Sequence, residues 1–207
     1  VRIGAGPVAA PIIASQVIAR CARDHPGIAI EMDIGTPSEQ FPRLVRGDID
    51  MFIGNCDAIS LPANIQARVI DEVEPVFFVR KGHPLALQPR VELRDLRPWK
   101  MAHVRLTAPF VAWYSSAAGV GELHTGFQCD DFEMLAEAVE TSDMVSYASP
   151  QILARLLKRY AIAVLDIAGI DFRHHIHCAQ PAGRALSRPG QKVLQLIEAA
   201  FDTATAR

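Results

Sequence analysis

The sequence predicts an α/β protein built from two similar lobes. Strand-like and helix-like segments alternate along residues 1–54, and the alternation restarts after residues 81–86. This order is typical of a mostly parallel sheet with helices on its faces. Glycine and proline mark two breaks, near 81–84 and 168–169, where the chain could pass between the lobes. A single larger sheet is the competing interpretation.

The composition excludes several functional classes. The 207 residues, half of them hydrophobic, are enough for one large domain or two small ones. The net charge is −2 and the basic residues are scattered, so neither a nucleic-acid surface nor a lipid-binding cluster is expected. No apolar run approaches the ~18 residues of a membrane-spanning helix, and no signal peptide is visible. Because the chain starts with Val1 rather than Met, we expect an upstream part to be missing.

The cysteines predict a reducing compartment. They lie too far apart in the sequence for a C-x-x-C metal or redox motif: Cys21, Cys56, Cys129 and Cys178. We therefore expect four reduced thiols in a cytoplasmic protein. A redox switch between two cysteines and a cysteine nucleophile are the less supported alternatives.

The first 54 residues predict a βαβαβ unit. Its strands are expected at 1–3, 28–35 and 48–54, the second with a clear alternation of apolar and polar residues. The first helix starts near Pro7 and stops at 25–27; its buried side chains are Ile12, Ile13, Val17, Ile18 and Cys21. The second helix begins with a capping box formed by Thr36, Pro37 and Glu39, buries Phe41, Leu44 and Val45, and ends at Gly47.

The carboxyl ends of these strands are the predicted binding edge, since ligands of open α/β sheets bind there. The ends are Gly4–Val8, Gly35–Ser38 and Gly54–Asp57. Helix N-termini offer free N–H groups and a partial positive charge. Two such termini, at Pro7–Ala9 and Thr36–Ser38, would suit a small carboxylate or another anionic acceptor group.

The rest of the chain continues the alternation. Strands are expected at 65–70, 73–80, 99–106, 144–148, 161–167 and 172–179, and helices at 131–139, at 149–160 and from Ser187 onward. Residues 107–121 are expected to form a loop and turn.

The opening loop also fits a dinucleotide motif, with Gly4, Gly6 and Ala9 in the spacing G-x-G-x-x-A. The nearest acidic residues, Glu31 and Asp33, lie 27 to 29 residues after Gly4, not about 20, and within a strand rather than at its end. A tight turn with no ligand is another explanation. We favour a loop that binds a small molecule.

Several phrases, in order, carry a family resemblance: HPGIAIEMDIGTPSEQFPRLVRGDIDMFIG, VEPVFFVRKGHPLA, VELRDLRPWKMA and GRALSRPGQKVLQLIEAAF. Together they resemble the effector-binding domain of LysR-type transcriptional regulators, over nearly the whole chain. The resemblance implies two Rossmann-like lobes, as in type 2 periplasmic binding proteins, joined by two crossover segments. Lobe I would comprise 1–78 plus 168–207, and lobe II 79–167.

The resemblance also implies partners. A small-molecule effector would bind in the cleft between the lobes, and the domains would form a homodimer or tetramer. DNA would be bound only through an N-terminal winged helix-turn-helix domain that this chain does not contain. We expect no catalysis, no cofactor, no metal and no membrane.

Carried over onto this sequence, the resemblance assigns effector contacts to Pro7, Val8, Ala9, Thr36, Ser38, Thr107, Pro109 and Phe110. Many relatives have Ser or Thr at Val8, so a less polar contact is expected there. Together with Phe110, Val8 favours an aromatic or apolar acid as the effector. The segment Glu140–Ser146 lacks the two glycines common in the family, which puts the shape of the lobe II cleft in doubt.

Other residues give weaker signals. His175 and His177 would share one face of a strand and Cys178 the other, but a third metal ligand is missing. No G-x-S-x-G or H-E-x-x-H motif occurs. Trp99 is expected in the core. Trp113 and Tyr114 are expected in a loop, where they could pack in the core or contact a ligand. A periplasmic-type solute-binding protein and a dinucleotide-dependent enzyme remain the alternative functions.

Overall fold

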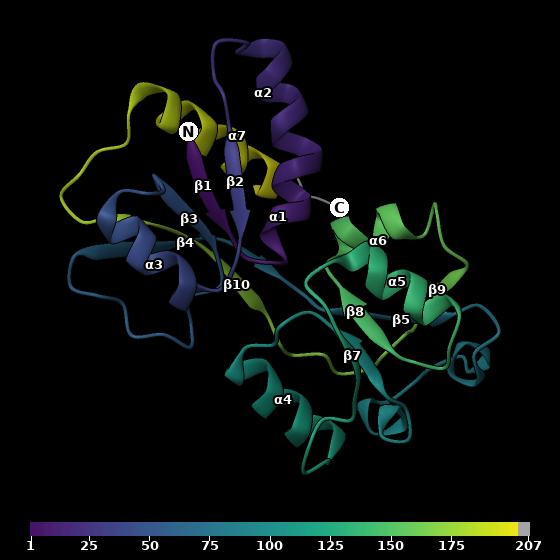
Figure 1. Ribbon diagram of the computed structural model, residues 1–207. Coiled ribbons are helices and arrows are strands. Elements are labelled where there is room, and N and C mark those ends of the chain that lie inside the picture. The colour runs from purple at the N-terminus through teal and green to yellow at the C-terminus, as the bar shows by residue number, and fades with distance from the viewer. Residues whose placement is uncertain (203–207) are drawn as a thin grey trace. The chain divides into compact units, whose positions relative to one another are not determined.

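The structure is a computed structural model that describes residues 1–202 (Figure 1). The chain divides into two compact units. Unit 1 contains residues 1–72 and returns at His175, and unit 2 is the single segment Val73–His174. The chain therefore crosses between units after Glu72 and after His174, whereas the sequence-based prediction divides it after residues 78 and 167.

Unit 1 is built on a five-stranded sheet in the order β2-β1-β3-β10-β4. Strands β1 and β2 are parallel, as are β1 and β3, which confirms the predicted βαβαβ arrangement; β10 runs antiparallel to β3. The bounds are β1 Arg2–Ala5, β2 Glu31–Ile34, β3 Met51–Gly54, β4 Ile65–Val73 and β10 His174–Pro181. Strand β2 is shorter than predicted, because residues 28–30 do not join the sheet.

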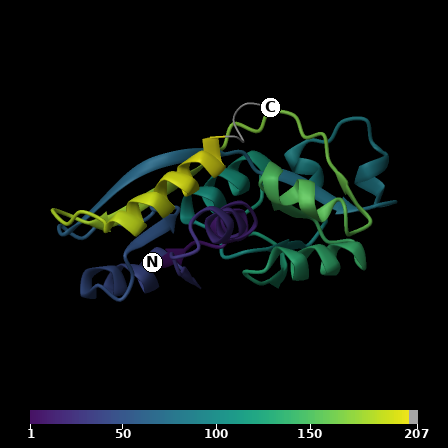
Figure 2. The same ribbon diagram turned by 90° about the horizontal axis from the view of Figure 1, so that it is seen from above.

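The helices of unit 1 pack against this sheet and against each other. One helix runs through α1 Ala9–Ile12, a π-helical segment η1 Ile13–Ile18 and α2 Ala19–Asp24. Helix α3 (Pro37–Arg46) packs on β3, and α7 (Arg188–Asp202) packs on η1. Figures 1 and 2 show α7 in yellow beside the purple α1–α2 helix. Four residues of the predicted stripe of the first helix are buried, namely Ile12, Ile13, Val17 and Cys21, whereas Ile18 is only partly buried.

Unit 2 contains two small sheets. Strands β8-β5-β9 form an antiparallel sheet, and β6 pairs with β7 in parallel. The alternative of one large sheet is therefore wrong. The bounds are β5 Val76–Arg80, β6 Met101–His103, β7 Thr125–Gln128, β8 Ser146–Ala148 and β9 Ile162–Val164; the helices are η2 Pro84–Leu87, η3 Leu93–Leu96, α4 Ala108–Ala118, α5 Phe132–Glu140 and α6 Pro150–Leu156.

Helix α4 corrects the prediction of a loop at residues 107–121. The Thr107 side chain caps its start, and Gly119 ends it in the left-handed region at φ 66°. Every fourth residue is buried, namely Phe110, Tyr114 and Ala118. The pattern is hard to see in the sequence because most residues between them are apolar or small as well.

The described cysteines are all free, and three of them are buried. Burial raises the pKa of Cys56 to about 12 and that of Cys178 to about 11. A thiol with a raised pKa is a poor nucleophile, so neither residue has the environment of a reactive cysteine. In residues 1–202, no helix combines the length and hydropathy required to cross a bilayer.

Candidate functional site

The parallel strands of unit 1 bring three loops to one edge of the sheet. Ala5, the last residue of β1, pairs with Ile34 of β2 and with Ile53 of β3. The loops that follow, 6–8, 35–38 and 54–57, therefore begin side by side. Backbone bonds join them, from Gly6 N–H to the carbonyl of Ile53 at 2.8 Å and from Gly35 N–H to the carbonyl of Ala5 at 2.9 Å.

The glycines of the opening loop are explained by close packing. A Cβ atom on Gly4 would lie 2.8 Å from the Gln40 and Ile49 side chains, and one on Gly6 would lie 3.3 Å from the Cα of Gly54. Both glycines are thus needed where β1 passes its neighbours. The G-x-G spacing requires no dinucleotide.

The first loop presents Pro7 and Val8 to the edge. Both are partly exposed, whereas Ala9 is fully buried. The N–H groups of Ala9 and Ala10 donate to the carbonyl of Gly6, each at 3.0 Å. Val8 provides no side-chain cap for the helix. Three effector contacts were predicted in this loop. One of them, Ala9, has no exposed side chain.

The second loop forms the predicted capping box. The N–H of Thr36 donates to Glu39 Oε2 at 2.7 Å, and the Thr36 hydroxyl donates to the same oxygen at 2.9 Å. The Thr36 and Ser38 hydroxyls are 2.9 Å apart. The start of α3 is therefore occupied by the carboxylate of Glu39.

The third loop carries a polar cluster that was not predicted from the sequence. We call Asn55, Asp57, Glu72, His175 and His177 the Asp57 cluster. Asp57 lies 3.1 Å from His175 Nδ1 and 3.6 Å from His177 Nε2, and it accepts from Asn55 Nδ2 at 2.7 Å. Glu72 lies 3.5 Å from His175 Nε2. The sequence correctly placed both histidines on one face of β10 and Asp57 at the predicted binding edge, but it gave no sign that they lie together.

Hydrogen bonding fixes the protonation pattern of His177. The backbone N–H of Cys56 donates to His177 Nδ1 at 3.3 Å, so the proton of the neutral ring is on Nε2, facing Asp57. Burial lowers the pKa of His177, and the neighbouring His175 lowers it further, whereas Asp57 acts in the opposite direction. The protonated Nε2 of the neutral ring faces Asp57 at 3.6 Å, and a protonated ring nitrogen does not ligate a metal.

Unit 2 has a comparable edge of its own. Strands β6 and β7 are parallel, and a parallel bridge joins Met101 to Val145 just before β8. The segments after these strands contain the starts of three helices. Thr107 caps α4, Asp131 caps α5 and Ser149 caps α6, each through its side chain.

Phe110 is placed differently from the prediction. Its side chain has no exposed area, and its ring stacks on Tyr147 at 4.5 Å and on His174 at 5.2 Å between centroids. It lies in the core of unit 2 and cannot contact an effector there. The neighbouring Pro109 is exposed and Thr107 is partly exposed, so these two stay candidates. Trp113 and Tyr114 lie in α4, where both rings pack against unit 2 aromatics.

The turn at Glu140–Ser146 does not lie at this edge. It precedes β8, and Val145 N–H donates to the carbonyl of Lys100, which precedes β6. The missing family glycines therefore affect the amino end of the unit 2 strands rather than the edge that carries Thr107.

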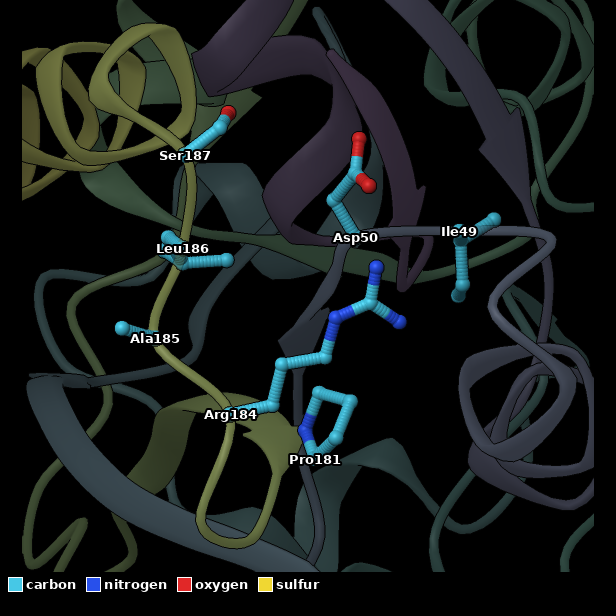
Figure 3. A pocket seen from close by; sticks show the side chains of 7 residues that line it. All are labelled: Ile49, Asp50, Pro181, Arg184, Ala185, Leu186 and Ser187. Carbon is cyan, nitrogen blue, oxygen red and sulfur yellow. The ribbon is translucent and has the colours of Figure 1, made fainter.

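Another pocket lies at the opposite edge of unit 1. It has a volume of about 70 Å³ and is lined by Ile49, Asp50, Pro181, Arg184, Ala185, Leu186 and Ser187. Figure 3 shows the Arg184 guanidinium lying toward Asp50. Asp50 also accepts the backbone N–H of Arg2 at 2.8 Å, and Arg184 is exposed. The pocket is small and lies away from the three loops at the carboxyl ends of the strands, so we do not assign the site to it.

Comparison with known proteins identifies the domain. The family model described as the LysR substrate binding domain matches residues 1–202. The chain belongs to this family. It is the effector-binding domain of a LysR-type regulator, as the resemblance implied, and its α/β fold is that of type 2 periplasmic-binding-protein-like domains.

Individual relatives agree with this assignment. The chain is 26% identical over 200 residues to the SDS degradation transcriptional activation protein of Pseudomonas sp. (strain ATCC 19151), a match that covers 95% of this chain and 65% of that protein. The chain thus spans about two thirds of this relative's length.

Solved structures share the fold. The Synechocystis PCC6803 CcmR regulatory domain, solved in complex with 2-PG, is 17% identical with a TM-score of 0.74, covering 97% of this chain and 96% of that one. HinK, a LysR family transcriptional regulator from Pseudomonas aeruginosa, is 18% identical with a TM-score of 0.78, covering 97% and 69%.

Proposed function

We propose that this LysR domain senses a small-molecule effector through the loops at the carboxyl edges of its two units, in the inter-lobe cleft that the family implies. The observation that carries the proposal is the parallel β2-β1-β3 arrangement of unit 1, which brings three loops to one edge. Pro7, Val8, Thr36 and Ser38 in unit 1, and Thr107 and Pro109 in unit 2, are the proposed contacts.

Effector binding would act through the equilibrium between lobe arrangements. A ligand shifts such an equilibrium only by its differential affinity for the two states. The chain passes twice between units, after Glu72 and after His174. A change in lobe angle would be transmitted to a dimer or tetramer and from there to DNA.

The proposal also covers the part of the protein outside this domain. A relative whose name describes a transcriptional activation protein extends beyond the region that this chain matches. We propose that DNA is bound by an additional N-terminal winged helix-turn-helix domain. We further propose that the protein works in the cytoplasm and that the domain binds its effector without transforming it.

The loops support an aromatic or apolar acid as the effector less well than the sequence did. An aromatic or apolar acid was favoured by Val8 and Phe110 together. Val8 is partly exposed at the edge, but Phe110 is buried in the unit 2 core. One of the two reasons for an aromatic acid is therefore removed.

Calorimetric titration with a panel of metabolites tests the proposed contacts. Thr36→Val and Thr107→Val each remove a hydroxyl from one edge, and Thr141→Val removes one at the end of α5 as the matched control. We expect at least tenfold weaker binding in one or both edge variants, as the loss of a hydrogen bond of about 1.4 kcal/mol predicts, and unchanged binding in the control. Unchanged affinity in both edge variants would reject this placement of the site.

A further inference from the structure

We propose that unit 2 carries a second binding site, for a small ligand that joins an apolar body to one carboxylate. The site is a groove with a volume of about 450 Å³, lined by Pro98, Trp99, Lys100, Gly126 and residues 142–144, which we call the Trp99 groove. Small-molecule sites usually have volumes of about 300–1,000 Å³. The inference goes beyond the effector contacts proposed above and does not depend on them.

The Trp99 groove lies at the amino ends of the unit 2 strands. Strands β6 and β7 are parallel, and a parallel bridge joins Met101 to Val145, so the segments that enter β6 and β8 lie side by side. Trp99 comes just before β6, and residues 142–144 come just before β8. Thr107, a proposed effector contact, follows β6 instead. A ligand in the groove would therefore occupy a site of its own within unit 2.

The floor of the groove is apolar and fixed in place. Trp99 packs against the hydrophobic core of unit 2, and its ring centroid lies 4.3 Å from that of His83, which is fully buried. Trp99 and Met144 are each only partly buried, so part of their apolar surface faces solvent. A flat indole beside a flexible thioether suits an aromatic or branched apolar group.

The wall formed by residues 142–144 is held by its own hydrogen bonds. The Ser142 hydroxyl donates to the carbonyl of Ala138 at 2.6 Å and accepts from the N–H of Met144 at 3.2 Å. A Cβ atom on Gly126, on the neighbouring strand β7, would lie 2.7 Å from Met144 Sδ and 2.9 Å from Lys100 Cβ. Only a glycine at position 126 lets these two side chains approach one another. The segment 140–146, which lacks the family's glycines, thus supplies a built wall of the groove.

Two hydrogen-bond donors of the groove are unused. Within residues 1–202, neither the Lys100 ammonium nor the indole N–H of Trp99 has a hydrogen-bond partner. Asp143 is the acid of the groove, but Nε and Nη2 of Arg80 donate to it at 2.8 and 2.6 Å. The charge of Asp143 is therefore matched by Arg80, and the positive charge of Lys100 is left over.

These features together match a ligand with two parts. An apolar body over Trp99 and Met144 removes apolar surface from water, and a carboxylate accepts from the Lys100 ammonium in a charge-assisted hydrogen bond. A cation would be repelled by Lys100, and an uncharged ligand would leave the ammonium without a partner. A small inorganic anion would gain nothing from the apolar floor. An apolar carboxylate uses both parts of the groove.

Titration with 3-phenylpropanoate tests the site, with the uncharged 3-phenylpropanamide as the matched ligand. The chain has two tryptophans, so the nitrogen-15 NMR spectrum should contain two indole N–H signals, which Trp99→Phe or Trp113→Phe assigns. We expect the Trp99 signal to shift and saturate with both ligands. Saturation should need about two- to fivefold less of the carboxylate than of the amide, the size of one exposed charge pair. An unmoved Trp99 signal, or equal affinities for the two ligands, would overturn the inference.

Three variants locate the carboxylate. Lys100→Gln should bring the affinities for the two ligands together, whereas Lys158→Gln, which removes another exposed charge from unit 2, should keep them apart. A preference for the carboxylate that persists in Lys100→Gln would overturn the inference. Thr107→Val should bind both ligands as the wild type does. Weaker binding in Thr107→Val would place the ligand at the effector edge, which would overturn the second site and leave the proposed function standing.

Discussion

The backbone N–H of Cys56 donates a hydrogen bond to Nδ1 of His177 at 3.3 Å, although the two residues are 121 positions apart in the sequence. Protonation of His177 would place a proton on Nδ1, where it would meet the N–H of Cys56. The bond therefore favours the neutral ring, in line with the lowered pKa of His177.

This relationship predicts that the domain loses stability in acid. The folded pKa of His177 is below its unfolded value of about 6.5, so the unfolded chain binds more protons between the two values. The stabilisation is complete above the unfolded pKa and is lost as the pH falls through the folded pKa. Burial lowers the pKa values of His83 and His103 as well, so they add to the same trend.

The share of His177 can be measured by urea unfolding at several pH values from 8 to 5. His177→Asn keeps an acceptor for Cys56 but cannot be protonated in this range. We expect the free energy of unfolding of this variant to fall less steeply with acid than that of wild type. An unchanged slope would show that His177 does not titrate as its burial predicts.

The burial of Phe110 predicts a large loss of stability on truncation. Phe110→Ala would leave a cavity among Tyr147, His174 and Phe172, and buried Phe→Ala changes cost about 3–5 kcal/mol. Val111→Ala, at the next and exposed position of α4, should cost less than about 1 kcal/mol. Chemical denaturation of both variants compares the two costs, and similar small losses would contradict the core position of Phe110.

The contact between Gly6 and Gly54 predicts that neither position accepts a side chain. A Cβ on Gly54 would lie 2.7 Å from the Phe52 ring and 3.1 Å from the nitrogen of Gly6. We expect Gly54→Ala to destabilise the fold by about 1–3 kcal/mol, the usual cost of overpacking. Gly27→Ala is the control, because nothing lies within 4 Å of its Cβ, and it should be neutral or slightly stabilising. Melting temperatures would separate the two cases.

The thiols should differ in their rates of alkylation. Cys21, Cys56 and Cys178 are buried, whereas Cys129 is partly exposed. Mass spectrometry after brief treatment with iodoacetamide should find Cys129 modified at least tenfold faster than Cys56 or Cys178, whose thiolate forms are disfavoured by their raised pKa values. Labelling in denaturant, where all four should react alike, is the control. Rapid native labelling of Cys56 would instead indicate a reactive thiol.

Much of unit 1 could be predicted from local signals in the sequence. The capping box at Thr36, the glycine stop at Gly47 and the alternation around Met32 each depend on a few neighbouring residues, and the structure contains all three elements. Helix α4 lacked such a signal, since its mostly apolar sequence hides the spacing of its buried residues. The π-helical turn at Ile13–Ile18 has no recognisable pattern either.

The candidate site was less predictable, because its residues meet only after folding. The pairing of β10 with β3 brings His177 beside Cys56 and Asp57. The spacing of these residues in the sequence does not predict that contact. Phe110 shows the opposite difficulty. Its type and position fitted an effector contact, and only the packing of Tyr147 and His174 around it shows a core role.

The position of β10 has a consequence for the order in which the chain can fold during synthesis. It lies between β3 and β4, although it follows β4 by about a hundred residues. Until the ribosome has released residues 174–181, β4 has no neighbour on that side and its backbone groups stay open to wrong partners. Unit 2, one uninterrupted stretch, can close first. Nascent chains stopped at His174 should therefore contain a protease-resistant C-terminal part, preceded by an N-terminal region that is still digested.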